Sequence, residues 1–591
     1  SSHSARLIAL AAANGIAIGR AKVFYPPADL ASVPDKPVRS TKAEISRFKK
    51  AVAATIVDIK TMKTSMSHSL ASEELTLFDA YIQMASDQSL IDEVSAEIAA
   101  GQWAPSALRR VIERHVRAFE ALADSYFRER STDLVDIARR ILSHLENSAQ
   151  VRPKLSKPSI LVAEEITASM LAEVPLDKVL GMVSMRGSST SHAAILAKAL
   201  GIPAVSGLED ECSDAIPIHQ FEGKQLALDG YQGILYISPS DALIKQYRDL
   251  TREEKRLSRE LIKEVKQPAV TLDGQSIEIH LNTGLLADFE PNVVEQVDGV
   301  GLYRTEIPFL LREYFPSEEE QIKIYRSVQN VYQSKPVNFR TLDIGGDKQL
   351  SYFPINESNP SLGWRGVRIT LDHPEIFLVQ VRAILIASLN VDNLKISLPM
   401  VSSVDEMDDA TRLIRQAHFE ICQEYPADQL TMPDIGLILE VPSSIYLLPE
   451  LLKRVDFVSV GSNDLIQYLL AVDRNNSRVS SLFSHFHPSL LRALRDIVVR
   501  CKENNKPVYL CGEMAGDPMA ALLLLAMGFN GLSMSANSIG KVKKVIRSFT
   551  FSESKIILET LMNYEKANLI KDYLSGIFEQ KGLGGLIRAG R

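Results

Sequence analysis

The spacing of apolar residues changes several times along the 591 residues of this chain. Residues 7–25 alternate in the manner of short β-strands, and a proline-rich connection follows them. From about residue 41 to residue 145 the apolar residues recur at helical spacing with almost no proline, as in 107–123 and 131–145. The first part of the chain is therefore predicted to be a small β element followed by a helical bundle.

Short apolar runs typical of β-strands return after the bundle. They lie at residues 159–162, 179–183, 225–228 and 233–237. Between the second and third runs, apolar residues recur at helical spacing from His192 to Leu200, and Gly201 ends that segment. An α/β unit is therefore expected to resume after the helical insertion.

The second half of the chain begins with a charged helical segment, residues 241–266, which ends at Pro268 and suits a linker between large domains. Beyond it, strand-like segments alternate with helices over roughly 300 residues. The strand-like segments are residues 277–281, 299–302, 338–341, 395–398, 436–439, 457–460, 508–510 and 531–534. Eight strands over this length are typical of a (β/α)8 barrel.

These patterns predict an α/β multidomain protein, in which an α/β domain with an inserted helical bundle precedes a (β/α)8 barrel of the TIM type. The expected boundaries are residues 1–38 and 149–240 for the α/β domain, 39–148 for the helical insertion, 241–268 for the linker helix, 269–575 for the barrel and 576–591 for a C-terminal tail.

The composition narrows the class of protein. With 46% hydrophobic residues, 24% charged residues and a formal net charge of −7, the chain does not resemble a general nucleic-acid binder, which would be basic. Apolar runs such as 520–527 are far shorter than the ~20 residues that cross a bilayer, and the N-terminus lacks a signal pattern, so we expect a cytoplasmic protein without a membrane partner.

The four cysteines show no metal-ligand spacing and are expected to be reduced thiols: Cys212, Cys422, Cys501 and Cys511.

The first candidate for chemistry is His192, which follows the polar segment 188–191 and lies in the first turn of the predicted helix. Unbonded backbone N–H groups and the positive end of the helix dipole gather there, so a phosphate carried on the imidazole would be stabilised. A lone histidine near a helix start is more often a capping or packing residue. Other residues of the chain are needed to distinguish these two interpretations of His192.

Four arginines stand at or just after the ends of predicted barrel strands, where catalytic groups of such barrels project. They are Arg304, Arg340, Arg365 and Arg474. Guanidinium groups offer forked donors that stay charged, which a phosphorylated dianionic substrate requires. A single arginine at such a place is more often a surface or salt-bridge residue, but four at strand ends favour a phosphate site.

Two carboxylates and a thiol also stand at strand ends. Glu440 and Asp464 form a candidate ligand pair for Mg²⁺, which takes few protein oxygens and completes its shell with water and substrate phosphate; each could instead be a helix-capping acid. Asn463 adds an amide donor beside Asp464. Cys511 could protonate a carbanion or enolate, although a buried, inert cysteine is the alternative.

With these residues in view, the chain resembles enzyme I of the phosphoenolpyruvate-dependent phosphotransferase system, over essentially its whole length and in the same domain order. The motifs that carry the resemblance are Gly-Val-Gly-Leu-Tyr-Arg-Thr-Glu at 299–306, Arg-Thr-Leu-Asp-Ile-Gly-Gly-Asp-Lys at 340–348, Leu-Gly-Trp-Arg at 362–365, Gly-Ser-Asn-Asp-Leu at 461–465 and Cys-Gly-Glu at 511–513. Each motif is weak alone, but together they are highly specific.

The resemblance implies that phosphoenolpyruvate binds in the barrel, with Mg²⁺ held by Glu440 and Asp464. The residues implied to grip the phosphoryl group are Arg304, Arg340 and Arg474, with Arg365, Lys348 and Asn463 nearby. By the same likeness, Cys511 is the acid that converts enolpyruvate to pyruvate.

The resemblance also makes the α/β domain a swivelling phosphohistidine domain. His192 would take the phosphoryl group at Nε2 and pass it to a histidine of a small HPr-like carrier docked on the helical insertion. Thr190 and Thr167 fall where the family has hydroxyls near this imidazole. The positions where carrier-contacting residues are expected are Phe78, Asp79, Ile82 and Met84. The family forms dimers through the barrel, so a homodimer is expected.

One departure bears on the branch of the family. Enzyme I of the sugar branch has an arginine before Thr-Ser-His, whereas this chain has Ser189. The segment is more similar to the nitrogen-branch paralogue, which normally carries an N-terminal GAF sensor domain; a truncation would explain its absence and the Ser-Ser-His-Ser start. Losing the arginine removes a positive neighbour of the histidine, so its pKa and transfer rate are expected to differ. The sugar-branch enzyme is the alternative.

Two further alternatives belong to other functional classes. Pyruvate phosphate dikinase and phosphoenolpyruvate synthase share the histidine domain and the barrel, but they need an ATP-grasp domain, for which this chain has no Gly-rich nucleotide loop. A non-catalytic sensor of phosphoenolpyruvate is the other alternative. The joint presence of His192, Glu440, Asp464 and Cys511 argues against it.

Overall fold

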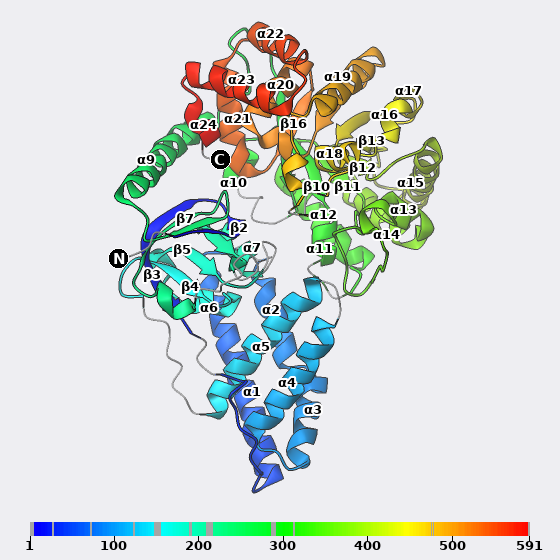
Figure 1. The fold of residues 1–591 in the computed structure, drawn as a ribbon. Helices are drawn as coiled ribbons and strands as arrows, with labels where there is room; N and C mark the ends of the chain where they lie inside the picture. The colour runs from blue at the N-terminus through cyan, green and yellow to red at the C-terminus, as the bar shows by residue number, and fades with distance from the viewer. Residues whose placement is uncertain are drawn as a thin grey trace. The chain divides into compact units, whose positions relative to one another are not determined.

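The computed structural model describes residues 5–25, 29–70, 74–121, 125–146, 155–187, 192–208, 217–284, 291–310, 312, 314–473, 476 and 478–588. The described chain forms two compact units (Figure 1). The first unit runs to residue 254 and the second comprises residues 255–588, so the boundary falls within the long charged helix α9 (Asp241–Glu264).

The first unit contains an eight-stranded mixed sheet with the order β1-β8-β7-β3-β4-β5-β6-β2. Its strands are β1 (Ala5–Ile8), β2 (Leu10–Ala13), β3 (Ile16–Phe24), β4 (Ser159–Ala163), β5 (Val179–Ser184), β6 (Ala204–Ser206), β7 (Gln225–Asp229) and β8 (Ile234–Ile237). Strands β3 to β6 are parallel to one another, while β2, β7 and β1 join the sheet in antiparallel pairs. Because β4 is buried on both faces, its run of apolar residues reads as continuous rather than alternating.

The helical bundle of the first unit is inserted between β3 and β4. It consists of α1 (Thr41–Met66), α2 (Thr76–Ala85), α3 (Gln88–Ala99), α4 (Ala104–Glu120) and α5 (Ser125–Leu145). Helix α1 begins where the Ser40 hydroxyl accepts a hydrogen bond from the backbone N–H of Ala43. Two short helices, α6 (Ala168–Glu173) and α7 (His192–Leu200), accompany the sheet.

The second unit is built on a closed barrel of eight parallel strands, in which β16 pairs with β9 and completes the ring. The strands are β9 (Glu278–Thr283), β10 (Gly299–Arg304), β11 (Val337–Arg340), β12 (Leu394–Leu398), β13 (Asp434–Leu439), β14 (Phe457–Val460), β15 (Val508–Leu510) and β16 (Gly531–Met534). All eight predicted barrel strands are confirmed, with differences of no more than a few residues at their ends. The (β/α)8 fold class is therefore correct.

Helices surround the barrel and bury its outward-facing apolar residues (Figure 1). They are α10 (Pro291–Val294), α11 (Glu306–Leu310), α12 (Glu318–Tyr332), α13 (Val367–Asp372), α14 (Pro374–Ala387), α15 (Val404–Glu424), α16 (Ser443–Tyr446), α17 (Leu448–Leu452), α18 (Ser462–Leu470), α19 (Pro488–Glu503), α20 (Pro518–Met527), α21 (Ala536–Ser548), α22 (Phe551–Leu561), α23 (Ala567–Gln580) and α24 (Gly584–Arg588). Among the residues that the structure describes, none of the helices has the length and hydropathy required to cross a membrane.

Strand β6, which has three residues and lies directly after Pro203, was not predicted. So short a run carries no recognisable period. Its place in the sheet is fixed by tertiary pairing, because β6 is parallel to β5 and antiparallel to β2, almost 200 residues away in the chain.

A buried hydrogen bond in the helical bundle gives a test of this fold. The Tyr81 hydroxyl donates to Asp133 Oδ1 over 2.7 Å inside the core. Tyr81→Phe should lower the free energy of unfolding of the first unit by about 1–3 kcal/mol, because it deprives a buried carboxylate of a donor. Urea unfolding followed by Trp103 fluorescence in a Trp364→Phe background measures this. Tyr25→Phe, at a side chain 58% exposed, is the matched control and should change stability by less than about 0.5 kcal/mol; equal effects would contradict the assignment.

Candidate active site

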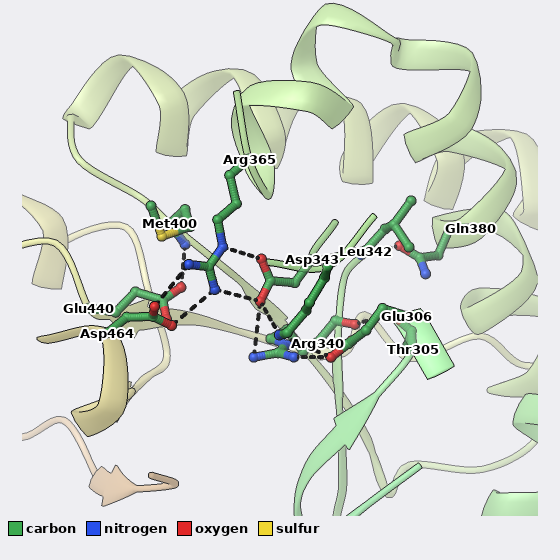
Figure 2. Close-up of polar contacts among 11 residues, drawn as sticks. Thr305, Glu306, Arg340, Leu342, Asp343, Arg365, Gln380, Met400, Glu440 and Asp464 are labelled. Atoms are coloured by element: carbon green, nitrogen blue, oxygen red, sulfur yellow. Dashed lines mark hydrogen bonds and ion pairs between the residues drawn. The ribbon is translucent and has the colours of Figure 1, made fainter. Parts of the chain in front are cut away.

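The predicted barrel residues gather at one rim, because all the strands run in the same direction. Arg304 and Arg340 are the last residues of β10 and β11. Glu440 follows β13, and Cys511 follows β15. Asp464 lies in the first turn of α18, directly after β14. Separate strands therefore bring these side chains to a common rim, although some of them are more than 200 residues apart in the chain. Figure 2 shows Arg340, Glu440 and Asp464 among them.

Two buried carboxylates next to Arg340 hold it in place. Glu306 and Asp343 have side chains 2% and 0% exposed, and both form ion pairs with Arg340, that of Asp343 over 3.4 Å. Lys348 Nζ reaches the same two carboxylates, at 3.3 Å from Glu306 and 3.0 Å from Asp343. Buried charges persist only where opposite charges compensate them, so these four residues form one interdependent cluster.

Arg365 extends this cluster to the other side of the rim (Figure 2). Its Nε and Nη2 donate to Asp343 over 3.2 and 3.3 Å, and its Nη1 and Nη2 donate to the two oxygens of Asp464 over 2.9 and 3.0 Å. Burial raises the pKa of Asp464, but the Arg365 guanidinium outweighs this effect and holds the pKa below its usual value. Burial likewise acts against the ionised form of Asp343, yet the surrounding cations hold its pKa well below the usual range.

Glu440 behaves differently from its neighbours. It is 1% exposed, and one of its oxygens accepts a hydrogen bond of 2.7 Å from the backbone N–H of Met400. Burial and the nearby carboxylates of Asp464 and Asp343 raise the pKa of Glu440 to about 8. A carboxyl in this setting is ionised at neutral pH only if another positive charge binds beside it. The donor chemistry therefore fits a hard cation such as Mg²⁺.

The cation site would be an open one. Within the described part of the chain, no cluster of three or more His, Cys, Asp and Glu side chains could enclose a metal. Mg²⁺ does not need such a cage, because it commonly binds one or two carboxylates and keeps water and substrate phosphate in its remaining positions. Glu440 and Asp464 supply two carboxylates and leave the other positions to a substrate.

Cys511, directly after β15, belongs to a small apolar cluster with Leu302 and Ile438. Burial raises the pKa of the Cys511 thiol, although the Ser459 hydroxyl and the Arg340 guanidinium, which lie close to it, act in the opposite direction. Its Sγ points to the backbone carbonyl of Val460 over 3.5 Å. The group is therefore held as a thiol, which is the form that can donate a proton.

Asn463 ties two neighbouring segments of the rim together. Its side-chain oxygen accepts a 3.0 Å hydrogen bond from the backbone N–H of Glu513, two residues after Cys511. The start of α18 and the segment after β15 are thus fixed to each other. This contact was not foreseen, since Asn463 had been expected to contribute its amide N–H groups to the substrate.

For the other predicted site residues the structure describes fewer contacts or none. Arg304 is exposed at the end of β10 and is near enough to Cys511 to influence the thiol's charge. Arg474 and Thr190 lie outside the described residues, as does Ser189. Helix α7 begins at His192, but the side chain of His192 is outside the described part. Thr167 caps helix α6, its hydroxyl accepting a hydrogen bond from the Met170 N–H.

One expected carrier contact is wrong. Phe78 is fully buried in the helical bundle, where its ring meets Tyr81 edge-on at 6.5 Å between centroids, so it has no surface to offer a partner. Asp79 pairs with Lys63 over 2.7 Å. Ile82 and Met84 are partly buried and pack against the core of the first unit. Position on an amphipathic helix could not distinguish the inward face from the outward face.

Comparison with known proteins decides the family. The sequence models described as PEP-utilising enzyme, N-terminal, mobile domain and PEP-binding domain match residues 9–130, 155–233 and 258–551. A Salmonella typhimurium protein named "Phosphoenolpyruvate-dependent phosphotransferase system" is 41% identical over 99% of this chain and 77% of its own length. Its Escherichia coli namesake is 44% identical over 88% of this chain and 68% of its own length. The "Phosphoenolpyruvate-protein phosphotransferase" of Staphylococcus carnosus is 35% identical over 95% of this chain and 98% of its own length.

The chain belongs to the phosphoenolpyruvate-protein phosphotransferase, or enzyme I, family. The resemblance drawn from the sequence motifs is confirmed.

Two acidic residues at the barrel rim, Glu306 and Asp343, were not predicted as site residues from the sequence. Both lie inside the motifs at 299–306 and 340–348, each two or three residues after a strand-end arginine. That spacing was a usable signal, because a buried arginine needs a nearby counter-charge. The spacing does not show that both acids form ion pairs with the same two residues, Arg340 and Lys348.

Gly512 provides a test of the rim geometry. A Cβ on Gly512 would overlap the hydroxyl of Ser462 and lie 2.9 Å from its backbone nitrogen, at the start of the helix that carries Asp464. Gly512→Ala should therefore lower phosphoenolpyruvate-dependent turnover by roughly 100-fold, because small displacements of catalytic groups have costs of this order. Gly576→Ala, where a Cβ meets nothing within 4 Å, is the control and should retain full activity. A normal rate in Gly512→Ala would refute the requirement for this close approach.

Proposed function

We propose that this protein phosphorylates itself on His192 with phosphoenolpyruvate bound at the barrel rim, and then passes the phosphoryl group to a histidine of an HPr-like carrier. The observation that carries the proposal is the joint placement of buried cations, a carboxylate pair and a protonated thiol at one rim. Such a set can bind a dianion, hold a divalent cation and supply a proton.

The arginines would bind the phosphoryl group of the substrate. Arg340 is suited to this task because its Nε lies buried without a hydrogen-bond partner among the described residues, and an anion would satisfy it. We assign the same role to Arg304 and Arg474, and we place Arg365, Lys348 and Asn463 around them. In this arrangement the carboxylates of Glu306 and Asp343 fix the cations before substrate arrives.

Glu440 and Asp464 would hold Mg²⁺, which supplies positive charge to the substrate phosphate and carboxylate when it is bound. The reaction breaks the bond between phosphorus and the enol oxygen, and forms a bond between phosphorus and His192 Nε2. The enolate that remains collapses to the keto form as its C3 takes the proton of Cys511. Transfer requires His192 to reach the rim, and we propose that the α/β domain moves on the linker at residues 241–268.

We further propose that the protein belongs to the nitrogen branch and serves a carrier of that branch. One observation supports this: Ser189 stands where the sugar-branch enzymes have an arginine. A cytoplasmic homodimer that associates through the barrel is part of the same proposal. Phosphotransfer to purified sugar-branch and nitrogen-branch carriers tests the branch.

Substitution of the phosphorylated residue is the first test. His192→Ala should abolish formation of acid-labile phosphohistidine and the matching release of pyruvate, while the barrel still binds phosphoenolpyruvate in calorimetry. His219→Ala, which removes an exposed histidine from the same unit, should label normally. Persistent labelling of His192→Ala would remove this residue from the mechanism.

The metal ligands are tested separately. Glu440→Gln keeps the shape of the side chain but removes the negative charge, so the Mg²⁺ concentration needed for half-maximal turnover should rise by about 10- to 100-fold. Glu450→Gln, an exposed neighbour on α17, is the control and should leave the Mg²⁺ dependence unchanged. If both variants require the same Mg²⁺ concentration as the unaltered protein, Glu440 is not a ligand.

A further inference from the structure

Six non-glycine residues in the described part of the chain have a positive φ, which side chains disfavour because Cβ then crowds the backbone. Five of them lie in turns, in a bend or at helix ends, and none of these is buried: Ser238, Gln333, Asn390, Ala471 and Asn505. The sixth is Met400, which has φ +60° and is 1% exposed. A buried residue keeps this conformation only where the surrounding structure requires it, and such residues cluster at functional sites.

Met400 lies two residues after β12, at the rim of the barrel, and Figure 2 shows it beside Glu440. Its backbone N–H donates to Glu440 Oε1 over 2.7 Å. The other oxygen, Oε2, lies against Gly461, since a Cβ on that glycine would be only 2.9 Å from it. Gly461 directly precedes α18, the helix that carries Asp464. The hydrogen bond from Met400 therefore occupies one oxygen of Glu440 and leaves the other facing the start of α18.

The backbone around Met400 is held by loops on both sides. The hydroxyls of Ser443 and Ser444, which follow β13, donate to the carbonyls of the two residues after Met400 over 2.9 and 2.5 Å. On the other side, the N–H of Val367 donates to the carbonyl of the residue before Met400 over 3.3 Å. A Cβ on Gly366 would lie 3.1 Å from both Cβ and Cγ of Met400. The loops after β11, β12 and β13 therefore meet at Met400 and keep its backbone in the left-handed conformation.

We propose that Met400 is a positioning residue for the cation site, because its left-handed backbone directs the N–H to Glu440 Oε1 and so presents Oε2 on the side of Asp464. The inference rests on the proposed function of Glu440 and Asp464 as Mg²⁺ ligands. Hydrogen bonds to metal-binding residues orient them before the metal arrives, and their loss typically weakens metal binding by about 10- to 100-fold. In this role the conformation of the Met400 backbone matters more than the volume of its side chain.

A series of substitutions at Met400 separates the backbone role from simple packing. Glycine adopts a positive φ readily, alanine does so less easily, and β-branched valine least of all. The apolar volume of the side chain increases in the same order, from glycine to valine. A positioning role therefore predicts that metal binding is best preserved by glycine, whereas a packing role predicts that it is best preserved by valine.

Binding of Mn²⁺ to the full chain without phosphoenolpyruvate, followed by electron paramagnetic resonance of the free ion, measures the cation site without turnover. Mn²⁺ prefers the same oxygen ligands as Mg²⁺. Met400→Val should weaken Mn²⁺ binding by about tenfold or more, because the N–H turns away from Glu440. Met400→Ala should have a smaller effect, and Met400→Gly should weaken binding by less than about threefold.

Thermal unfolding of the same variants should follow the opposite order. Met400→Gly should lower the Tm most, because it removes the most apolar contacts from a buried position. Met407→Ala is the matched control, since Met407 is an equally buried methionine in the regular helix α15, and it should leave Mn²⁺ binding unchanged. Glu440→Gln identifies the part of the signal that belongs to this site, and should weaken binding at least as strongly as Met400→Val.

The outcomes separate the two levels of inference. Unchanged Mn²⁺ binding in Glu440→Gln would overturn the proposed function of Glu440 as a ligand. If Glu440→Gln weakens binding but Met400→Gly weakens it as much as Met400→Val, or if neither has an effect, the positioning role of Met400 alone is overturned. Should Met400→Val fail to fold, the other two variants decide, because Mn²⁺ binding by Met400→Ala as tight as that by Met400→Gly, or tighter, would also overturn it.

Discussion

The guanidinium of Arg365 is the contact on which the barrel rim depends. It joins Asp343, in the loop after β11, to Asp464, at the start of α18, and both carboxylates are well shielded from water. Removing one partner from such a buried pair typically costs about 3–5 kcal/mol, because the charge left behind is neither solvated nor paired. The rim therefore depends on these ion pairs to keep its charged groups in position. Its geometry is set before any substrate binds.

The same network of ion pairs explains why neighbouring carboxyl groups have pKa values shifted in opposite directions. Asp343 and Asp464 share Arg365 and stay ionised, whereas Glu440 faces their charges and accepts its hydrogen bond from a neutral backbone N–H. Asp343 and Asp464 have ion-pair partners, whereas Glu440 forms no ion pair with a residue that the structure describes. In the proposed function a divalent ion would compensate this imbalance, and a dianionic substrate would then meet both the metal and the arginines at one rim.

Polar side chains are also found inside the barrel, below the rim. A TIM barrel does not require serine, asparagine and histidine in its interior for stability, and each such group has to be hydrogen-bonded to be tolerated. Here they form a layer beneath Cys511. The Asn282 amide donates to the backbone carbonyl of Cys511 over 2.8 Å, so this layer fixes the backbone that carries the thiol.

The sequence by itself determined the barrel and indicated which side chains stand at its rim. Strand periodicity and turn residues are local properties, so all eight strands could be predicted, and arginine, glutamate and cysteine after successive strands indicated the site. The tertiary structure alone decided which charges compensate each other. Glu306 and Asp343 became visible as partners of Arg340 only after the loops met, and Phe78 proved to be core rather than surface. His280 and Ser533 lie side by side because β9 closes the ring against β16, about 250 residues later in the chain, and contacts of that range leave no local pattern in the sequence.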